Sequence, residues 1–182
     1  MRIVAGTLRG RRLAAPEGDA TRPTADRVRQ ALFDRLLHAP WAGRDAVTGA
    51  AVLDTFAGTG ALGLEALSRG AAQATFFERD RAALAAVRAN VAACGAAGRA
   101  RVVEADATRP PPGTPCRLVF LDPPYGAGLI ERAIPALAAA GWFAPGCLLV
   151  METARDEALA VAGRLLDDHA YAAARIRILR RD

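Results

Sequence analysis

The run Asp122-Pro123-Pro124-Tyr125 combines residue types that can hold an amino group. Two consecutive prolines stiffen the backbone and remove two N–H groups, which leaves nearby carbonyl oxygens free to accept hydrogen bonds. The carboxylate of Asp122 and the carbonyl of Pro123 can then accept both hydrogens of an –NH2 group. Because the lone pair of a base amino nitrogen is delocalised into its ring, this grip would favour attack on a methyl group by offsetting the developing positive charge. Tyr125 adds a flat face on which an extruded base can stack.

A second group of candidate residues begins at Asp54 and the glycines that follow it. Gly58 and Gly60 let the backbone pass close to a ligand, and the segment that they open also matches the G-x-G-x-x-G fingerprint of dinucleotide-binding proteins. Glu78 can accept hydrogen bonds from two ribose hydroxyls, and Asp106 can receive an adenine amino group. These residues predict a cofactor that contains adenosine, and they fit a nicotinamide dinucleotide as well as S-adenosylmethionine.

Five predicted strands bring these residues to one edge of a sheet. Short apolar runs bounded by glycine or polar residues predict strands, and apolar residues every three to four positions predict helices. Strands are expected at 51–55, 74–78, 100–104, 118–121 and 147–152, and helices at 61–68, 82–93 and from 129 onward, interrupted or kinked at Pro135. This alternation predicts an α/β fold, with a parallel sheet, helices on both faces, and ligands beyond the carboxyl ends of the strands.

The two ends of the chain fit this pattern less closely. Near the C-terminus, residues 158–166 fit a helix and residues 174–179 alternate like a strand with one wet face. Residues 1–40 form an extension in which residues 2–5 fit one strand of a small basic hairpin, and a helix capped by Thr24 is expected to run to about position 37.

The positive charge is concentrated in the N-terminal extension. Residues 1–35 contain eight arginines and four acids, a net of +4 out of +5 for the whole chain. Such a concentration is typical of a surface that meets phosphates, although a solvated basic face without a partner would look the same.

Length and composition restrict the class of protein. At 182 residues the chain is expected to form a single domain, with its core over 51–182. No apolar run approaches the roughly 20 residues of a membrane helix, and the N-terminus lacks the apolar core of a signal peptide, so a cytoplasmic protein is expected. Cys94, Cys116 and Cys147 are widely spaced, which predicts buried free thiols and no metal site. Nothing in the sequence demands more than a monomer.

Residues 51–152 resemble a Rossmann-like class I S-adenosylmethionine-dependent methyltransferase that modifies amino groups. Residues 54–60 match the methionine-binding loop, Glu78 the ribose acid, Asp106 the adenine contact and 122–125 the catalytic motif. The resemblance also implies cofactor contacts for three neighbours of these residues, Phe56, Arg79 and Ala107.

The N-terminal third resembles the RsmD family in particular. The similarity to that family is clearest in the segments Arg2–Gly6, Arg9–Arg11 and Arg22–Arg29, followed by Leu32-Phe33. It runs over nearly the whole chain, with the exception of residues 153–166. Members methylate the N2 amino group of one guanine in bacterial 16S ribosomal RNA. The resemblance therefore implies S-adenosylmethionine as cofactor, 16S ribosomal RNA or the small ribosomal subunit as partner, no metal, and a seven-stranded, mostly parallel sheet with an antiparallel last strand. The candidates for contact with the RNA backbone are Arg9, Arg11, Arg12 and Arg22.

Several alternatives stay open at this point. A DNA adenine-N6 methyltransferase uses the same catalytic motif, but it usually carries an extra target-recognition domain for which this chain has little room. A protein-glutamine methyltransferase would be expected to have Asn at position 122. An NAD-dependent oxidoreductase would explain the glycines and Glu78 but gives residues 122–125 no role. A non-catalytic RNA-binding protein would bind RNA without methyl transfer, and the intact Asp122 argues against it.

Overall fold

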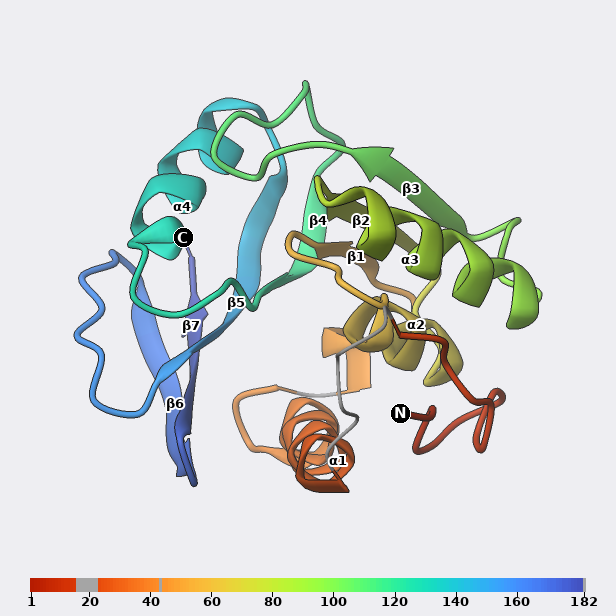
Figure 1. The fold of residues 1–182 in the computed structure, drawn as a ribbon. Helices are drawn as coiled ribbons and strands as arrows, with labels where there is room; N and C mark the ends of the chain where they lie inside the picture. The colour runs from red at the N-terminus through yellow and green to blue at the C-terminus, as the bar shows by residue number, and fades with distance from the viewer. Residues whose placement is uncertain (16–22, 43, 182) are drawn as a thin grey trace.

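Seven strands form one sheet in the computed structural model, which describes residues 1–15, 23–42 and 44–181 (Figure 1). The strands are β1 (Ala51–Asp54), β2 (Gln73–Glu78), β3 (Ala100–Glu104), β4 (Cys116–Leu121), β5 (Phe143–Ala154), β6 (Arg164–Tyr171) and β7 (Ala174–Arg180). Their order is β3-β2-β1-β4-β5-β7-β6. β1 to β5 run parallel, while β7 is antiparallel to both β5 and β6. The predicted α/β, Rossmann-like, mostly parallel sheet with an antiparallel last strand is confirmed.

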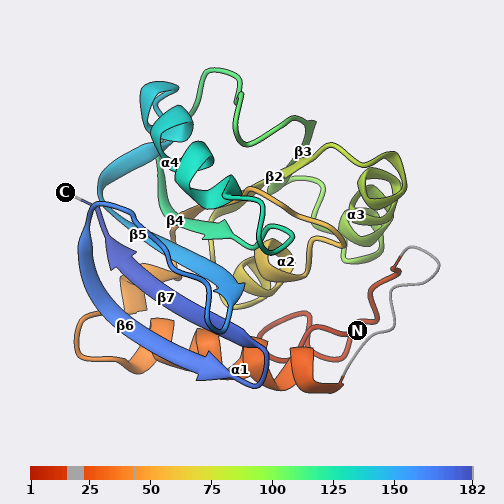
Figure 2. The same ribbon diagram turned by 60° about the vertical axis from the view of Figure 1, so that its left-hand side comes forward.

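Helices cover both faces of this sheet, as predicted (Figures 1 and 2). They are α1 (Pro23–His38), α2 (Ala61–Ser68), α3 (Arg81–Ala93) and α4 (Leu129–Ala139), with a short 3-10 helix at Arg44–Ala46. Successive side chains of a strand point to opposite faces, so alternate residues enter two separate cores. Val52 of β1 packs in the core beneath α1, α2 and α3, whereas Leu53 packs in the core beneath α4.

Most element boundaries agree with the prediction. The helix at 61–68 and the strand at 100–104 have the predicted bounds. α1 begins at Pro23, one residue before the predicted cap Thr24, because proline suits the first helical position, where no N–H donor is needed. α4 is continuous through Pro135, so of the predicted interruption or kink, the interruption is wrong. Pro135 is exposed, which lets water reach the carbonyl group that its missing N–H leaves unbonded.

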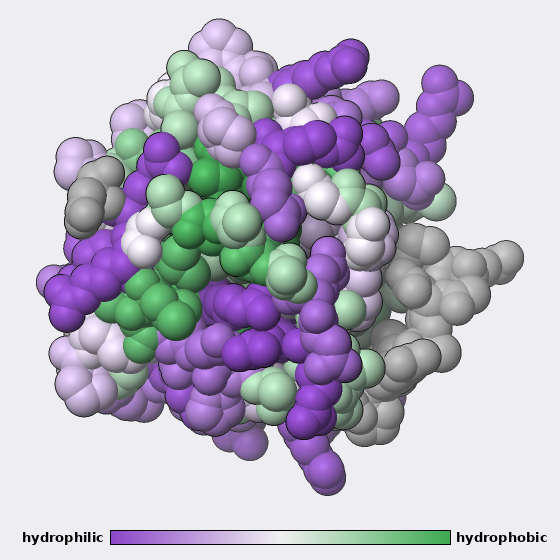
Figure 3. Space-filling view, turned by 90° about the vertical axis from the view of Figure 1, so that its left-hand side faces the viewer, coloured by the Kyte–Doolittle hydropathy of each residue, from purple (hydrophilic) through white to green (hydrophobic). Residues whose placement is uncertain are grey.

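The helix predicted at 158–166 is also wrong. Residues 158–163 are irregular and β6 begins at Arg164, where pairing with β7 outweighs the helix preference of the alanines and leucines. Gly163 precedes the strand with a φ of 147°, which other residues rarely adopt. β6 is an edge strand of the sheet, and its Leu165 is 54% exposed. Figure 3 shows an apolar area among charged side chains on the face of the molecule that carries α4 and β6.

The predicted basic hairpin is present at residues 1–13, with a bridge between Arg2 and Arg12. Its expected strand over residues 2–5 is shorter in the structure. The N–H groups of Val4 and Ala5 donate to the carboxylate of Glu65 (2.8 and 3.0 Å) and therefore do not continue the strand pairing.

Glu65 of α2 joins the N-terminal extension to the core. Its fully buried carboxylate pairs with Arg69 (2.8 Å) and with Arg29 of α1 (3.5 Å). Arg29 also pairs with Asp26 (2.8 Å) and donates to the carbonyl of Arg2. Because a buried charge is stable only when it is paired, this network fixes both α1 and the hairpin against α2.

Candidate active site at the carboxyl ends of the strands

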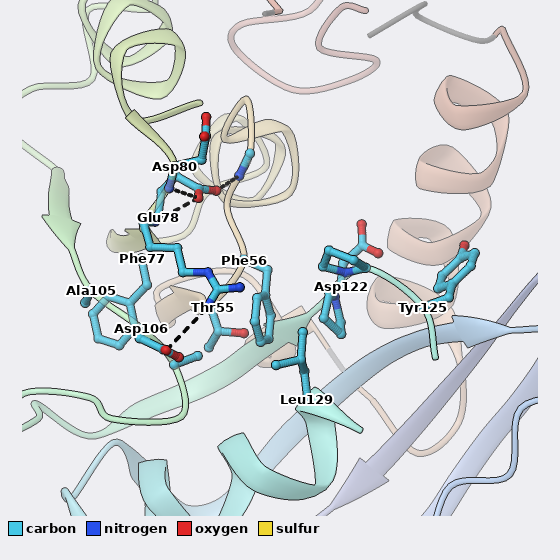
Figure 4. Close-up of a pocket in the computed structure, with 15 residues that line it drawn as sticks. Thr55, Phe56, Phe77, Glu78, Asp80, Ala105, Asp106, Asp122, Tyr125 and Leu129 are labelled. Atoms are coloured by element: carbon cyan, nitrogen blue, oxygen red, sulfur yellow. Dashed lines mark hydrogen bonds and ion pairs between the residues drawn. The ribbon is translucent and has the colours of Figure 1, made fainter. Parts of the chain in front are cut away.

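A cavity of about 770 Å³, the first cavity, lies at the carboxyl ends of β1, β2, β3 and β4 (Figure 4). Its walls come from the segments that directly follow these strands, where ligands bind in open parallel sheets. Phe77, Ala105 and Leu129 give it apolar surface. The predicted site residues that line it are Phe56, Gly58, Glu78, Arg79, Asp106, Ala107, Asp122, Pro123, Pro124 and Tyr125.

Glu78, at the end of β2, organises the glycine loop of the first cavity. Its carboxylate accepts hydrogen bonds from the backbone N–H groups of Gly58 (2.8 Å), Arg79 (2.7 Å) and Asp80 (2.8 Å) (Figure 4). A carboxylate has about four acceptor positions, so with three of them occupied Glu78 can still accept a hydrogen bond from a ligand hydroxyl. Gly58 has a φ of 54°, and a Cβ there would meet no atom within 4 Å, so the loop leaves open space beside it.

Asp106 follows the neighbouring strand β3 and is held by its own hydrogen bonds. One carboxylate oxygen accepts the N–H and the hydroxyl of Thr108 (both 2.8 Å), and the other pairs with Arg79 (3.4 Å). Burial tends to raise the pKa of Asp106, but these contacts outweigh it and hold the pKa below its usual value. Asp106 is therefore a negatively charged acceptor at neutral pH.

A second cavity of about 560 Å³ adjoins the first. Phe56, Gly58, Asp122 and Tyr125 line both cavities. The other walls of the second cavity come from parts of the chain that are distant in sequence: Met1, α1, the segment before α2, β5, and the turn between β6 and β7. A ligand in the first cavity and a ligand in the second would meet at the run Asp122–Tyr125.

Three acids end neighbouring strands on the second-cavity side of the sheet. Asp54 ends β1, Asp122 follows β4, and Glu152 lies near the end of β5. Asp122 and Glu152 come directly after Leu121 and Met151, which are Cα partners in the parallel pair of β4 and β5. All three line the second cavity. The hydroxyl of Tyr125 donates to Glu152 (2.7 Å), which holds the tyrosine ring beside this row.

The environment of this row disfavours negative charge. Burial raises the pKa of Asp54 to about 7, although the N–H of Gly63 donates to its carboxylate (3.0 Å). Burial, then the charges of Glu152 and Asp54, raise the pKa of Asp122 well above its usual value. Burial also raises the pKa of Glu152, against the lowering effect of the hydrogen bond from Tyr125. Carboxyl groups perturbed in this way and facing a cavity are typical of functional sites.

Two predicted cofactor residues lie away from the first cavity. Asp54 is buried and lines the second cavity only. Gly60 lines neither of the two cavities. Its φ is 79°, and a Cβ there would come within 2.7 Å of Val87, so glycine is needed for the packing of α2 against α3.

Three of the four predicted RNA-binding arginines lie on the hairpin. Arg9, Arg11 and Arg12 are exposed and make no ion pair with another described residue, while Arg22 lies outside the described residues. The residues before Arg9 donate to Ser68 at the C-terminal end of α2, so Arg9 lies at the end of the hairpin remote from Met1 and the second cavity.

The polar residues that sequence reasoning missed include Thr108, which holds Asp106, and Glu152, which lines the second cavity. Thr108 stands two positions after Asp106, a spacing that suits a local turn around a carboxylate. Glu152 ends the strand predicted at 147–152, so the rule that selected Glu78 and Asp106 would have selected it as well.

Comparison with known proteins assigns the chain to a family. The family model described as conserved hypothetical protein 95 matches residues 1–176. Ribosomal RNA small subunit methyltransferase D of Escherichia coli strain K12 is 46% identical over 155 residues, 84% of this chain and 74% of that protein. The protein of the same name from Haemophilus influenzae is 37% identical over 164 residues, 87% of this chain and 81% of that protein. The chain belongs to the RsmD family of methyltransferases.

Solved structures share the fold of this RsmD-family chain. The yhhF protein of Escherichia coli is 41% identical with a TM-score of 0.85, over 100% of this chain and 98% of that one. A structure from Haemophilus influenzae is 32% identical with a TM-score of 0.78, over 99% and 97%. Within the described ranges, no helix is long and apolar enough to cross a membrane, and no group of three or more His, Cys, Asp or Glu residues could hold a metal ion. The three cysteines are buried free thiols, as predicted.

Proposed function

We propose that this chain transfers the methyl group of S-adenosylmethionine to the exocyclic N2 amino group of a guanine in bacterial 16S ribosomal RNA. The observation that carries the proposal is the meeting of two cavities at Asp122–Tyr125, the run suited to holding an amino group. The relatives from two bacteria are named as methyltransferases of small-subunit ribosomal RNA, which supports the same class of substrate here.

The first cavity fits the proposed cofactor. Glu78 keeps an acceptor position for a ribose hydroxyl, and ionised Asp106 can accept from an adenine amino group. The apolar surface of Phe77 and Leu129 suits a purine ring, and the open space beside Gly58 would admit the methionine part. When bound, S-adenosylmethionine would supply an electrophilic methyl group on a positively charged sulfur, and cleavage of this S–CH3 bond would leave S-adenosylhomocysteine.

The run Asp122–Tyr125 would hold the acceptor in the second cavity. The carboxylate of Asp122 and the carbonyl of Pro123 accept the two hydrogens of the amino group and orient its nitrogen toward the first cavity. As this nitrogen becomes positively charged, Asp122 stabilises the charge and accepts the released proton. Tyr125, which is 46% exposed and held by Glu152, offers its ring to the flipped base.

The exposed arginines of the hairpin support an RNA substrate. Arg9, Arg11 and Arg12 are free to contact phosphates, because no described carboxylate pairs with them. Two other N-terminal arginines are already engaged, since Arg29 pairs with Glu65 and Arg35 pairs with Asp167 (2.8 Å). Three basic side chains available to RNA therefore lie together on the hairpin.

Methyl transfer to different nucleic acids tests the proposal. We expect labelled methyl from S-adenosylmethionine to enter unmodified ribosomal RNA or small-subunit particles, and nucleoside analysis to identify N2-methylguanosine. Label in DNA alone, or in N6-methyladenosine, would contradict the proposal. Calorimetry should show binding of S-adenosylhomocysteine, whereas binding of NAD alone would favour an oxidoreductase.

The variant Asp122→Ala tests the catalytic role of the carboxylate. We expect it to lower kcat by about 10²–10³-fold, as removal of one group that stabilises developing charge does in other enzymes. Affinity for S-adenosylhomocysteine, measured by calorimetry, should stay within a few-fold. Glu104→Ala removes an exposed carboxylate at the end of β3 and serves as the control. Activity of Asp122→Ala equal to that of the control would show that the grip is misassigned.

A further inference from the structure

Glu152 occupies the position beside Asp122 on the next strand. Leu121 and Met151 are Cα partners in the parallel pair of β4 and β5, so Asp122 and Glu152 follow at equivalent positions. Side chains two residues apart in a strand share a face. Glu152 therefore continues the row of Leu148 and Val150, which pack on the side of the sheet that α1 covers, and it lines the second cavity together with Asp122.

The carboxylate of Glu152 is only partly satisfied within the protein. Among the described residues it accepts one hydrogen bond, from the hydroxyl of Tyr125 to Oε1 (2.7 Å), and it forms no ion pair. Arg29, which alone of the described arginines lines the second cavity, is engaged by Asp26 and Glu65. Oε2 is thus left as an acceptor in a partly buried position, where an unpaired carboxylate is costly unless a ligand completes it.

The donor pattern of a guanine complements these two acids. On its Watson–Crick edge a guanine presents the N1–H and the N2 amino group side by side. We propose, on the basis of the function proposed above, that Glu152 accepts the N1–H of the target guanine while Asp122 holds its N2 amino group. Glu152 is then a specificity-determining residue, and Tyr125 sets the position of its carboxylate through the 2.7 Å hydrogen bond.

The same arrangement rejects adenine. Adenine N1 carries a lone pair and no hydrogen, so Oε2 of Glu152 would face another acceptor in a partly buried site. A site built to hydrogen-bond a substrate N–H discriminates strongly against an analogue that lacks it, because its polar group is left unpaired. The shared motif at 122–125 would grip the amino group of either base, so Glu152 supplies the distinction between them.

A base analogue tests this reading directly. 2-Aminopurine keeps the 2-amino group, but its N1 carries no hydrogen. Ribosomal RNA with guanine or 2-aminopurine at the mapped target position is compared by kcat/KM. For the unaltered protein we expect a preference for guanine of about 100-fold, as for loss of a hydrogen bond to a charged group in a buried site. In Glu152→Ala the preference should fall to within a few-fold, mainly through loss of activity on guanine.

Controls separate this inference from folding and from the proposed function. Glu152→Asp retains a carboxylate and should restore part of the preference, whereas Glu104→Ala should leave it unchanged. Thermal unfolding and calorimetry with S-adenosylhomocysteine check that each variant folds and binds the cofactor. N2-methylguanosine formed by the unaltered protein without a preference over 2-aminopurine, or a full preference in folded Glu152→Ala, would overturn the role of Glu152 alone. Absence of N2-methylguanosine would instead overturn the proposed function.

Discussion

The two cavities differ in how their carboxylates are satisfied. In the first cavity, Glu78 accepts three backbone N–H groups and Asp106 accepts two hydrogen bonds from Thr108. In the second cavity, Asp122 accepts no hydrogen bond from a described residue and Glu152 accepts one. The pKa values follow this difference: that of Asp106 is lowered, while burial raises those of Asp122 and Glu152.

This difference indicates what each cavity needs from its ligand. Internal hydrogen bonds preorganise the acids of the first cavity, so a cofactor would meet acceptors that are already fixed in place, which lowers the entropic cost of binding. Asp122 and Glu152 have fewer donors within the protein, and under the proposed function the N–H groups of the substrate base would supply the missing ones. A base with a different arrangement of donors would leave these acids unpaired, and this penalty provides specificity.

The cavities also differ in how the chain builds them. Loops that directly follow parallel strands form the first cavity, whereas the second needs α1 and Met1 to lie against the sheet. Glu65 secures that contact through its buried pairs with Arg29 and Arg69. Damage to this network should therefore affect the second cavity more than the first.

The variant Glu65→Ala provides the strongest test of this comparison. It leaves Arg29 without one buried partner and removes the acceptor of the N–H groups of Val4 and Ala5. We expect the free energy of unfolding, measured with denaturant, to fall by about 3–5 kcal/mol, as for other broken buried pairs. Below the unfolding transition, methyl transfer should be largely lost, while affinity for S-adenosylhomocysteine stays within a few-fold.

Two further variants check the Glu65 prediction. Glu65→Gln keeps one acceptor oxygen and should lose less stability, which provides a folded protein if Glu65→Ala does not accumulate. Glu104→Ala removes an exposed carboxylate that pairs with no described residue and should change neither property. Equal losses of cofactor affinity and methyl transfer in Glu65→Gln would mean that the two cavities are not separate units.

The variant Glu78→Gln tests the first cavity by itself. An amide has one acceptor oxygen, so either the N–H of Gly58 or those of Arg79 and Asp80 lose their partner. Hydrogen bonds to charged groups are worth about 1.5–3 kcal/mol, which predicts an increase of about 10- to 100-fold in the dissociation constant of S-adenosylhomocysteine, measured by calorimetry. The preference for guanine over 2-aminopurine should not change, and a changed preference would contradict the separation of the cavities.

Strand-end positions made the first cavity predictable from the sequence. Glu78 and Asp106 follow short apolar runs, and the parallel sheet brings such ends to one edge. Hydrogen bonds of these acids to Thr108 and to the glycine loop depend on local turns and were not specified by that rule. The predicted role of Gly60 shows the limit of a motif: its close approach to Val87 concerns helix packing and is visible only in three dimensions.

The second cavity was less predictable because its walls are far apart in sequence. No local pattern places Met1 and α1 next to the turn after Tyr171. β6, which leads to this turn, was predicted as a helix over part of its length, because an edge strand is specified by its partner and only weakly by its own residues. Asp122 and Tyr125 could be selected from the sequence by their residue types. That Glu152 is the neighbour of Asp122 on the adjacent strand follows only from the register of β4 and β5.

The pH dependence of kcat/KM gives the finest test of the paired acids in the second cavity. The grip requires ionised Asp122, whose pKa is raised by burial and then by the charges of Glu152 and Asp54. Below this pKa the carboxyl group carries a proton, so it can neither stabilise the developing positive charge nor accept the released proton. With increasing pH, kcat/KM should therefore rise by about tenfold per pH unit and then level off above the pKa. This rising limb of the profile reports an apparent pKa of the interacting acids as a group.

Glu152→Gln removes one negative neighbour, which lowers the pKa of Asp122, so the rising limb should move to lower pH even though the maximum rate falls. The exposed Glu104→Gln should leave the limb in place. A limb that stays in place in Glu152→Gln, or moves to higher pH, would show that the two carboxylates do not act together on the substrate.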